Sequence, residues 1–233
     1  MHVHELNWMQ LEEYLARDDR IILPLGSTEQ HGYLSLGTDN ILAERVSVEA
    51  AEPLNVPVLP VLPYGLTPAF AAFPGSPSLR LETFAALLRD LLDSLCDQGF
   101  RRFLLVNGHG GNTPAGSLAR EWMASRHDAQ VIFHSWWASE RVLARAREID
   151  PSPSHANWFE NFLWTRLAGV ELPSEPKAPL DEAAYRVAGP AGIRELLGDG
   201  VFEGAYELPD AQTDEVWRTG VEEVRELLES GWR

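Results

Sequence analysis

Short apolar runs alternate along the chain with segments whose apolar residues recur every three or four positions. The runs at 20–26, 102–106 and 130–134 contain β-branched and aromatic residues, and the first two are closed by Gly or by Asn-Gly. Such runs are typical of strands, and the first two are typical of strands buried on both faces of a sheet. The apolar spacing across 79–97 predicts a strongly amphipathic helix. The pattern therefore predicts strands and helices in alternation.

Further helix signals lie between and after these strands. We expect a helix over 38–51 with Thr38 as its N-cap, a helix over 114–126 that begins at a proline, and a final helix over 216–228. The proline-rich segment 57–63 is expected to be an edge or irregular strand. Strand, helix and strand in succession favour a parallel sheet covered by helices, which predicts an α/β fold.

The composition agrees with a globular protein. Of the 233 residues, 45% are hydrophobic and 23% are charged, so we expect a single domain spanning 1–233. The 19 Lys and Arg against 35 Asp and Glu give a net charge of −16, which argues against nucleic acid and anionic membrane as partners. The first 20 residues contain no apolar stretch, no later run is long enough to cross a bilayer, and Cys96 is the only cysteine. We therefore expect a cytoplasmic protein.

Two polar loops follow the predicted strands, at the edge of a parallel sheet where ligands usually bind. In the first loop, Glu29 and His31 are two residues apart, so an extended backbone directs both side chains to the same side. Asp39 follows at a predicted helix start, where its two carboxylate oxygens could bridge two cations. The second loop adds His109, which is flanked by glycines that allow backbone and metal to approach closely.

These two imidazoles and two carboxylates suit Zn²⁺, Mn²⁺ or Fe²⁺, whereas Mg²⁺ and Ca²⁺ prefer oxygen ligands alone. Two metals that share a carboxylate would activate a water molecule. A single histidine in a loop is more often an ordinary polar residue, but the pairing of two such loops at the expected ligand edge favours a metal site.

Other chemistries are poorly supported by the sequence. The glycine-rich loop 108–112 lacks both the spacing and the lysine of phosphate-binding loops. No Gly-x-Ser-x-Gly sequence surrounds Ser27 or Ser35, and Cys96 lies on the amphipathic helix. The sequence therefore argues against a serine or cysteine nucleophile.

A third polar cluster, 154–161, follows a Pro-Ser-Pro turn and is expected to enter a helix. His155 and Glu160 are separated by about 500° of helical rotation, and they would share a face only if the helix begins between them. His127 and His134 are expected to be surface residues or neighbours of the ligands. Trp136 and Trp137, just beyond the third strand, are expected to be core or pocket-wall residues.

Together, the three clusters resemble the creatininase (creatinine amidohydrolase) family, including its branch in mycofactocin maturation. The resemblance covers most of the chain. It rests on Leu-Pro-Leu-Gly-Ser-Thr-Glu-Gln-His-Gly at 23–32, Thr-Asp at 38–39, Phe-Pro-Gly-Ser at 73–76, Val-Asn-Gly-His-Gly-Gly-Asn at 106–112 and His-Ala-x-x-x-Glu at 155–160. It implies a three-layer α/β/α fold with a mainly parallel sheet, a dinuclear metal centre, hydrolysis of a non-peptide or cyclic amide C–N bond, and usually a homo-oligomer.

The resemblance also implies roles for individual residues. One metal would be held by Glu29, Asp39 and His109, and the other by His31, the shared Asp39 and Glu160. His155 would lie beside the reacting carbonyl as a proton shuttle, so His155 and Glu160 are the expected catalytic residues.

The sequence departs from the family pattern at two places. Family members that act on creatinine tend to have an acidic residue two places after the histidine of Asn-Gly-His. This chain has Gly111 there, which argues against creatinine as the substrate. The final motif, usually His-Ala-Gly-x-x-Glu-Thr-Ser, reads His-Ala-Asn-Trp-Phe-Glu-Asn-Phe at 155–162. Two aromatics and an asparagine thus alter the pocket side, and Glu160 is either a ligand or a neighbour of the ligands.

We therefore predict a metal-dependent hydrolase in which an activated water attacks a small, cyclic amide and His155 protonates the leaving nitrogen. Two alternatives stay open: a peptidase or maturation factor that acts on a modified precursor peptide, and a metal-containing binding module without turnover. The expected partners are a small neutral or cationic amide and further copies of this chain. Four closely spaced aromatics could cover an interface or fill a core: Trp158, Phe159, Phe162 and Trp164.

Overall fold

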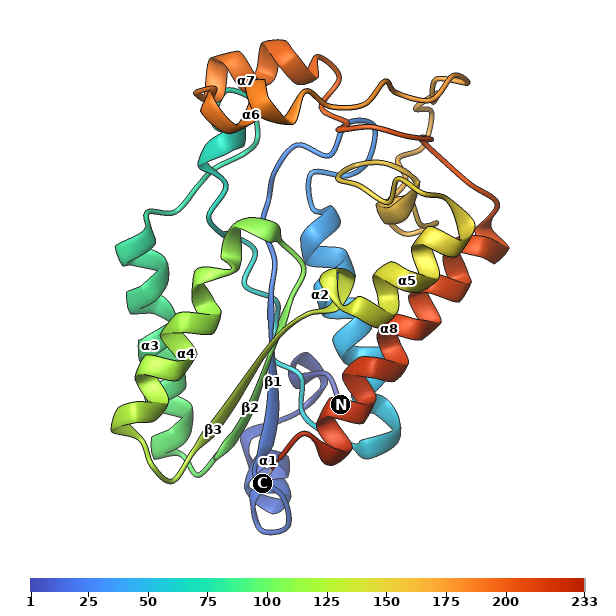
Figure 1. Cartoon of the computed structure of the whole chain (residues 1–233). Coiled ribbons are helices and arrows are strands. Elements are labelled where there is room, and N and C mark those ends of the chain that lie inside the picture. Colours follow the sequence, from blue (N-terminus) through green and yellow to red (C-terminus); the bar gives the residue numbers. More distant parts are fainter. Residues whose placement is uncertain (233) are drawn as a thin grey trace.

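The centre of the molecule is a sheet of three parallel strands. In the computed structural model, which describes residues 1–232, their order is β1-β2-β3 (Figure 1): β1 (Arg20–Leu25), β2 (Arg102–Asn107) and β3 (Gln130–Ser135). The strands pair in register, so that Leu25, Asn107 and Ser135 lie side by side at the carboxyl ends. The three predicted strands and their parallel pairing are confirmed.

Helices cover both faces of this sheet. One layer contains α3 (Leu81–Asp97) and α4 (Pro114–Ser125), and the other contains α2 (Thr38–Ala51), α5 (Glu140–Ile149) and α8 (Asp210–Ser230) (Figure 1). Neighbouring side chains of β1 point into different layers, because Ile21 packs in the core with α3 whereas Ile22 packs in the core with α2 and α8. The predicted three-layer α/β/α architecture is confirmed.

Shorter elements complete the fold. A cap of two helices, α6 (Glu182–Val187) and α7 (Pro190–Leu197), lies above the carboxyl ends of the strands, and α1 (Trp8–Leu15) lies near the opposite end (Figure 1). The 3₁₀ turns are η1 (Val3–Glu5), η2 (Glu52–Leu54), η3 (Pro68–Phe70), η4 (Gly110–Asn112), η5 (Trp136–Ala138) and η6 (Trp158–Glu160). Within residues 1–232, no helix has the length and apolar character needed to span a membrane.

The proline-rich segment 57–63 follows the outer edge of β1 without forming a regular strand. Val58 bridges Ile22 and Leu62 bridges Leu25, both in parallel orientation. Prolines have no N–H group to donate, which limits the segment to isolated bridges. The predicted irregular edge strand is confirmed.

The start of α2 differs from its prediction. Thr38 is the first residue of the helix and Gly37 occupies the cap position, with no side-chain cap. The Thr38 hydroxyl instead donates to the carbonyl oxygen of Ser35 at 2.7 Å. The predicted capping role of Thr38 is therefore wrong, although Asp39 does lie in the first turn.

The segment after His155 forms the single 3₁₀ turn η6 rather than the expected helix. Ala156 has a positive φ of 62°, which interrupts a right-handed helix at its start. The side chain of Asn157 then accepts a hydrogen bond from the N–H of Phe159, which caps one short turn. The prediction of a helix here is wrong because these local interactions favour a tight turn.

The closely spaced aromatics near this turn mostly fill the core. Trp158, Phe159 and Phe162 are each at most 3% exposed. The ring of Trp164 stacks on Phe162 and carries the Arg45 guanidinium 4.0 Å from its centroid. Of the two interpretations of this group, core packing holds for the three buried rings.

Candidate metal centre

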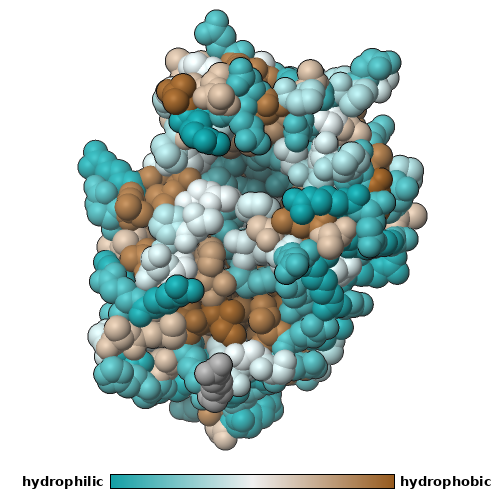
Figure 2. Space-filling view, viewed as in Figure 1, coloured by the Kyte–Doolittle hydropathy of each residue, from teal (hydrophilic) through white to brown (hydrophobic). Residues whose placement is uncertain are grey.

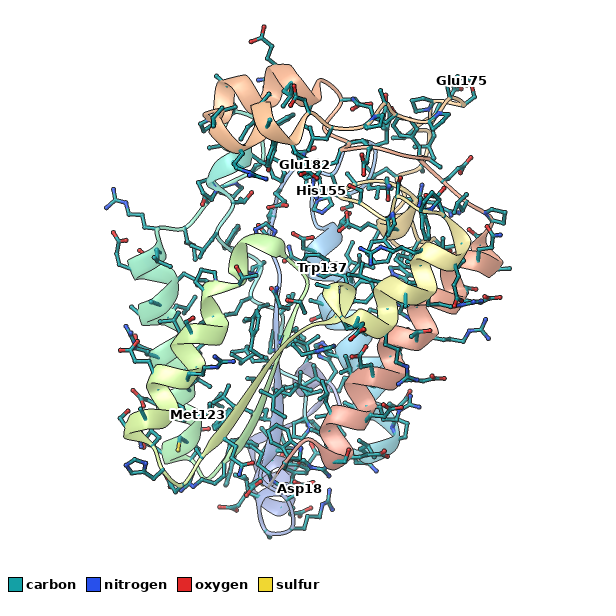
Figure 3. All side chains as sticks on the ribbon, viewed as in Figure 1. Asp18, Met123, Trp137, His155, Glu175 and Glu182 are labelled. Carbon is teal, nitrogen blue, oxygen red and sulfur yellow. The ribbon has the colours of Figure 1, made fainter. Side chains whose placement is uncertain are left out.

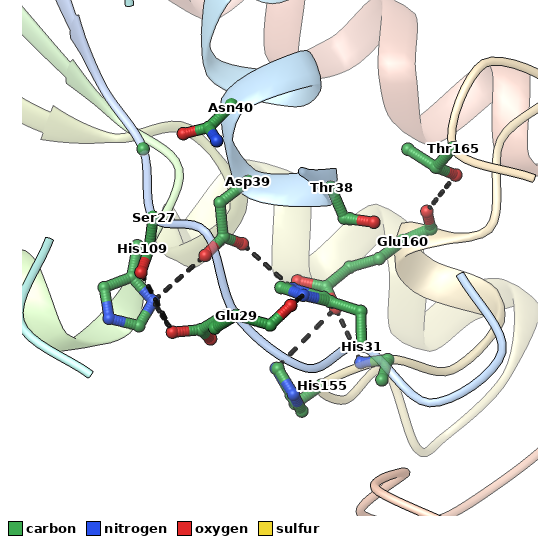
Figure 4. Close-up of polar contacts among 12 residues, drawn as sticks. Ser27, Glu29, His31, Thr38, Asp39, Asn40, His109, His155, Glu160 and Thr165 are labelled. Carbon is green, nitrogen blue, oxygen red and sulfur yellow. Dashed lines mark hydrogen bonds and ion pairs between the residues drawn. The ribbon is translucent and has the colours of Figure 1, made fainter. Parts of the chain in front are cut away.

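Six polar side chains converge beyond the carboxyl ends of β1 and β2 (Figure 4). Glu29 and His31 come from the loop after β1, and Asp39 comes from the first turn of α2. His109 comes from the loop after β2, and His155 and Glu160 come from the segment around η6. The loops emerge together because Leu25 and Asn107 are paired at the ends of parallel strands. The structure thus brings together every residue that the sequence indicated for the site.

Asp39 lies between two groups of potential ligands. In the first group, His109 Nδ1 is 3.1 Å from Asp39 Oδ2 and 3.2 Å from Glu29 Oε2. In the second group, His31 Nε2 is 3.0 Å from Asp39 Oδ1 and 3.7 Å from Glu160 Oε2. Within each group, the ligand atoms all lie within 4.8 Å of one another. The two oxygens of Asp39 therefore face different groups.

Backbone carbonyls orient both histidines. The Nε2 atom of His109 is 3.0 Å from the carbonyl oxygen of Leu66, and the Nδ1 atom of His31 is 3.2 Å from that of Glu29. Because a carbonyl oxygen only accepts, these two ring nitrogens are the donors. The other ring nitrogens, His109 Nδ1 and His31 Nε2, are thereby directed at the carboxylates. Fixing the tautomer in this way is common among metal-binding histidines.

The carboxylates of the cluster require positive charge beside them. Burial opposes the charge on His31, but the nearby Asp39 raises its pKa to about 10. Burial likewise opposes the charge on His109, and the close carboxylates of Asp39 and Glu29 raise its pKa well above the usual value. Burial alone would raise the pKa of Asp39, yet the charge on His31 holds it well below its usual range. Protonated His31 and His109 therefore supply the positive charge in this cluster.

A carboxylate oxygen of the cluster without a hydrogen-bond partner in residues 1–232 also supports a metal site. Asp39 Oδ2 is buried and, among the described residues, accepts no well-formed hydrogen bond. Leaving a buried carboxylate oxygen in this state is costly unless a cation lies beside it. Imidazole nitrogens and carboxylate oxygens are the donors that Zn²⁺, Mn²⁺ and Fe²⁺ accept.

His155 forms one wall of the cluster. Its ring stacks on Phe70 with centroids 4.9 Å apart and lies 4.5 Å from the ring of His31. Two atoms of Gln30 contact the Nε2 atom of His155: the backbone carbonyl oxygen at 3.1 Å and the side-chain nitrogen at 2.9 Å. Nδ1 therefore remains to face Glu160 Oε2, 3.9 Å away. Burial lowers the pKa of His155 well below its usual value, and the charge on His31 lowers it further.

Glu160 reaches the cluster from the turn η6. The N–H of Ala156 donates to its Oε2 atom at 2.6 Å, which aims the carboxylate at His31 and His155. Burial raises the pKa of Glu160 to about 7, with His31 opposing the rise and Asp39 adding to it. The left-handed backbone of Ala156 is what presents its N–H to this carboxylate.

Sequence reasoning missed Gln30 as part of the site. It is only 5% exposed, and its side-chain amide donates to the carbonyl oxygen of Gly200 at 3.0 Å. The alternation of side chains along an extended backbone argues against Gln30, because it directs that side chain away from Glu29 and His31. In the fold Gln30 nevertheless reaches His155, which itself lies beside His31, and nothing in the sequence indicated this contact.

Gly111 is fixed by its surroundings. A Cβ atom built there would collide with the carbonyl oxygen of Leu66 and lie 2.5 Å from His109 Nε2. No side chain can be added at this position unless that backbone moves. The site therefore differs physically at the place where an acidic residue is expected in chains that act on creatinine.

A cavity of about 990 Å³ opens over the cluster. In Figure 2, the surface is hollowed beneath the cap formed by α6 and α7. Glu29, Asp39, His155 and Glu160 lie on the cavity wall, and most of the remaining lining is apolar and aromatic. The aromatic lining residues are Phe70, Trp137, Phe159, Tyr185 and Phe202.

The structure also shows where several residues lie whose location the sequence left open. Trp136 is a core residue with 1% exposure, whereas Trp137 lines the cavity (Figure 3). Neither His127 nor His134 belongs to any of the potential ligand groups formed by residues 1–232. Cys96 lies on α3 and is buried in the core.

Comparisons with known proteins agree with this geometry. The family model described as Creatininase, creatinine amidohydrolase, matches residues 4–228. Creatinine amidohydrolase of Pseudomonas putida is 34% identical over 184 residues, which is 71% of each chain. The 3-dehydro-scyllo-inosose hydrolase of Thermotoga maritima is 31% identical over 206 residues, 81% of this chain and 65% of the relative. The mycofactocin precursor peptide peptidase of Mycolicibacterium smegmatis is 35% identical over 106 residues, 42% of each chain.

Solved structures share the fold over almost the whole chain. A crystal structure of creatinine amidohydrolase superposes with a TM-score of 0.82 at 25% identity, covering 99% of this chain and 97% of the other. A Zn-Zn form of a creatininase mutant has a TM-score of 0.80 at 24% identity, covering 99% and 97%. A manganese form of creatininase has a TM-score of 0.80 at 22% identity, covering 99% and 98%. The chain is therefore a hydrolase that belongs to the creatininase family.

Proposed function

We propose that the chain hydrolyses an amide C–N bond at a dinuclear metal centre. The observation that carries the proposal is the position of Asp39, whose two oxygens face two separate groups of imidazole and carboxylate ligands. The first group, completed by Glu29 and His109, would hold one divalent ion, and the second, completed by His31 and Glu160, would hold the other. These mixed nitrogen and oxygen donors suit Zn²⁺, Mn²⁺ or Fe²⁺.

The chemistry divides between the ions and the protein. Two divalent ions bound there would polarise the amide carbonyl and lower the pKa of a water molecule that attacks it. His155 is neutral, because burial lowers its pKa. With Nε2 engaged by Gln30, its Nδ1 atom can take up a proton beside Glu160 and pass it to the leaving nitrogen. The transfer would take place beside the apolar and aromatic walls of the cavity.

The substrate class that we propose first is a small, cyclic, non-peptide amide, by similarity to the Pseudomonas putida relative. Creatinine itself is not proposed, since Leu66 occupies the space that a side chain at Gly111 would need. The net charge of −16 favours a neutral or cationic amide over an anionic one.

A second candidate substrate is a peptide, as for the mycobacterial relative. The cavity of about 990 Å³ supports it, because small-molecule sites span roughly 300–1,000 Å³. A cavity at the upper end of this range has room for several residues around one amide bond. The metal chemistry would be the same, so only the size of the substrate distinguishes the two candidates.

The test combines metal analysis with a substrate panel. Metal-depleted protein is reconstituted separately with Zn²⁺, Mn²⁺ and Fe²⁺ and assayed against cyclic ureas, lactams, formamides, short peptides and an inosose. We expect two equivalents of metal per chain and hydrolysis that is lost with a chelator. Asp39→Ala should lose both equivalents, because no shared anion then offsets the repulsion between the two cations. His109→Ala should lose mainly one.

Two controls complete the test. His127→Ala removes a histidine outside the ligand groups and should keep both metals. His155→Ala should keep the metals and lose turnover, whereas a non-catalytic binding module would show no turnover in the unchanged protein either. Survival of two equivalents in Asp39→Ala would falsify the bridging role and the dinuclear proposal with it.

A further inference from the structure

Tyr185 is a cavity residue that no motif indicated. It lies on the six-residue helix α6 and shares the cavity wall with Glu29, Asp39 and His155. Figure 3 shows His155 below this helix, whose position is marked by Glu182. The sequence offered no reason to associate α6 with the metal centre, because its residues are outside the loops that follow the strands.

A row of aromatic rings leads from Tyr185 to the metal centre. The ring of Tyr185 packs edge-on against Phe202 with centroids 5.2 Å apart. Phe202 lies 4.9 Å from the ring of His155, which lies 4.5 Å from that of His31. Phe202 and Tyr185 also pack on the small core formed by Phe70, Ile193 and Leu197. This packing fixes the ring of Tyr185 on the wall of the cavity.

The hydroxyl of Tyr185 makes no hydrogen bond within residues 1–232, although its ring is partly buried. Tyrosine hydroxyls in such positions usually find a partner. Burial raises the pKa of Tyr185, and the negative charge of Glu29 adds to the rise. The phenol therefore keeps its proton at neutral pH and lies within the electrostatic field of the Glu29 carboxylate. It is an available hydrogen-bond donor on a residue that lines the cavity over the candidate metal centre.

We propose that Tyr185 is a substrate-binding residue whose hydroxyl donates a hydrogen bond to the amide held over the metal centre. This inference rests on the proposed function, because it requires an amide at that place. It also narrows the substrate class to amides with an acceptor oxygen beside an apolar or aromatic group, which would pack against Phe70 and Phe202. Donors placed around a reacting carbonyl stabilise the charge that develops on its oxygen.

The conservative variant Tyr185→Phe isolates the hydroxyl, because it leaves the ring and its packing in place. The probe is benzohydroxamic acid, an amide analogue whose oxygens bind divalent metals and whose ring suits the aromatic walls. Its Kd is measured by calorimetry on protein loaded with Zn²⁺. We expect Tyr185→Phe to raise this Kd about tenfold, the effect of losing one hydrogen bond. kcat/KM for any amide that the unchanged protein hydrolyses should fall at least as much.

The matched control is Tyr64→Phe, which removes the hydroxyl of an exposed tyrosine outside the cavity. Tyr64→Phe should leave the Kd, the metal content and the melting temperature unchanged. Tyr185→Phe should also keep its metal content and melting temperature, because its hydroxyl has no partner to lose within the described chain. A merely structural role would lower the melting temperature instead.

The possible outcomes separate the two proposals. If the unchanged, metal-loaded protein binds the probe and Tyr185→Phe binds it equally well, the role of Tyr185 is wrong and the proposed function stands. If the unchanged protein takes up metal but does not bind the probe, the role of Tyr185 fails, whereas the proposed function fails only if the substrate panel also shows no metal-dependent hydrolysis. An equal loss of affinity in Tyr64→Phe would also overturn the inference, since the effect would then be independent of the cavity.

Discussion

At the scale of single residues, the candidate metal centre sets the positive charge of protonated histidines against the negative charge of carboxylates. Glu29, Asp39 and Glu160 are all buried, and two histidines with raised pKa values neutralise part of their charge. Each histidine donates one ring proton to a backbone carbonyl and directs its second nitrogen at Asp39. A divalent ion that binds there must take the place of the proton on that second nitrogen.

Metal uptake should consequently release protons. His31 has a pKa of about 10 without metal, so below pH 10 it holds a proton that the incoming ion must displace. The affinity for Zn²⁺ should therefore fall as the pH is lowered, about tenfold per pH unit for each displaced proton. Calorimetric titration at pH 8 in two buffers of different ionisation enthalpy counts the protons released.

We expect at least one proton to leave per chain, and His31→Ala should reduce the count. Protonation of Glu160, with a pKa of about 7, should steepen the loss of affinity below neutral pH. A heat of binding that is identical in both buffers would mean that no proton is released, which contradicts the assigned state of His31.

At the scale of elements, the site depends on how closely the loop after β2 approaches α2. Gly108 allows this approach: a Cβ atom there would lie 2.6 Å from the backbone oxygen of Asp39 and 3.0 Å from Ala43 Cβ. The same contact holds the loop that carries His109 against the helix that carries Asp39. Two elements far apart in the sequence thus place their ligands through a single backbone contact.

Gly108→Ala should therefore damage stability and metal binding together. Overpacking of this kind costs about 1–3 kcal/mol, and the backbone oxygen of Asp39 cannot rotate away. We expect the free energy of unfolding to fall by that amount in a urea titration and the metal content to fall below two equivalents. The matched control is Gly110→Ala in the same loop, where a Cβ atom would make ordinary contact with Trp137 at 3.7 Å. Equal stability of the two variants would refute the argument.

The elements that were predicted correctly are those with a local signal. The three strands and α3 follow from apolar periodicity within about 20 residues, and the loops with Glu29 and His109 follow from their place after strands. The failures depend on distant or particular contacts. Gln30 and His155 meet although they are 125 residues apart. The turn at Glu160 depends on the left-handed backbone of Ala156, and an alanine in the sequence gives no signal of that conformation.

At the scale of the whole molecule, a strongly acidic surface surrounds a largely apolar cavity. The net charge of −16 attracts divalent cations and repels anions over long distances. The cavity itself contributes carboxylates at its floor and aromatic rings at its walls. We therefore expect the molecule as a whole to favour divalent cations and neutral or cationic substrates over anionic ones.

We expect the chain to form a homo-oligomer in solution. Three exposed apolar side chains follow the turn η6 closely: Leu163 is 65% exposed, Leu167 48% and Val170 42%. A second copy that covered them would also support the segment that carries Glu160. Light scattering coupled to size exclusion should give a multiple of 26.0 kDa, and Leu163→Asp should lower it. A single species of 26.0 kDa at high protein concentration would contradict this expectation.

The carbonyl oxygen of Leu66 constrains both Gly111 and the candidate ligand His109. It fills the space that a side chain at position 111 would need, and the same oxygen orients His109 through its hydrogen bond. A substitution at 111 alone would therefore disturb a ligand before it could offer any new contact to a substrate. We therefore expect the two positions to be epistatic, because the backbone around Leu66 must shift before, or together with, a change at Gly111. We expect directed evolution that varies residue 111 alone to yield only variants with a disturbed His109. Libraries that also vary residues 65–67 should yield variants that tolerate a side chain at 111.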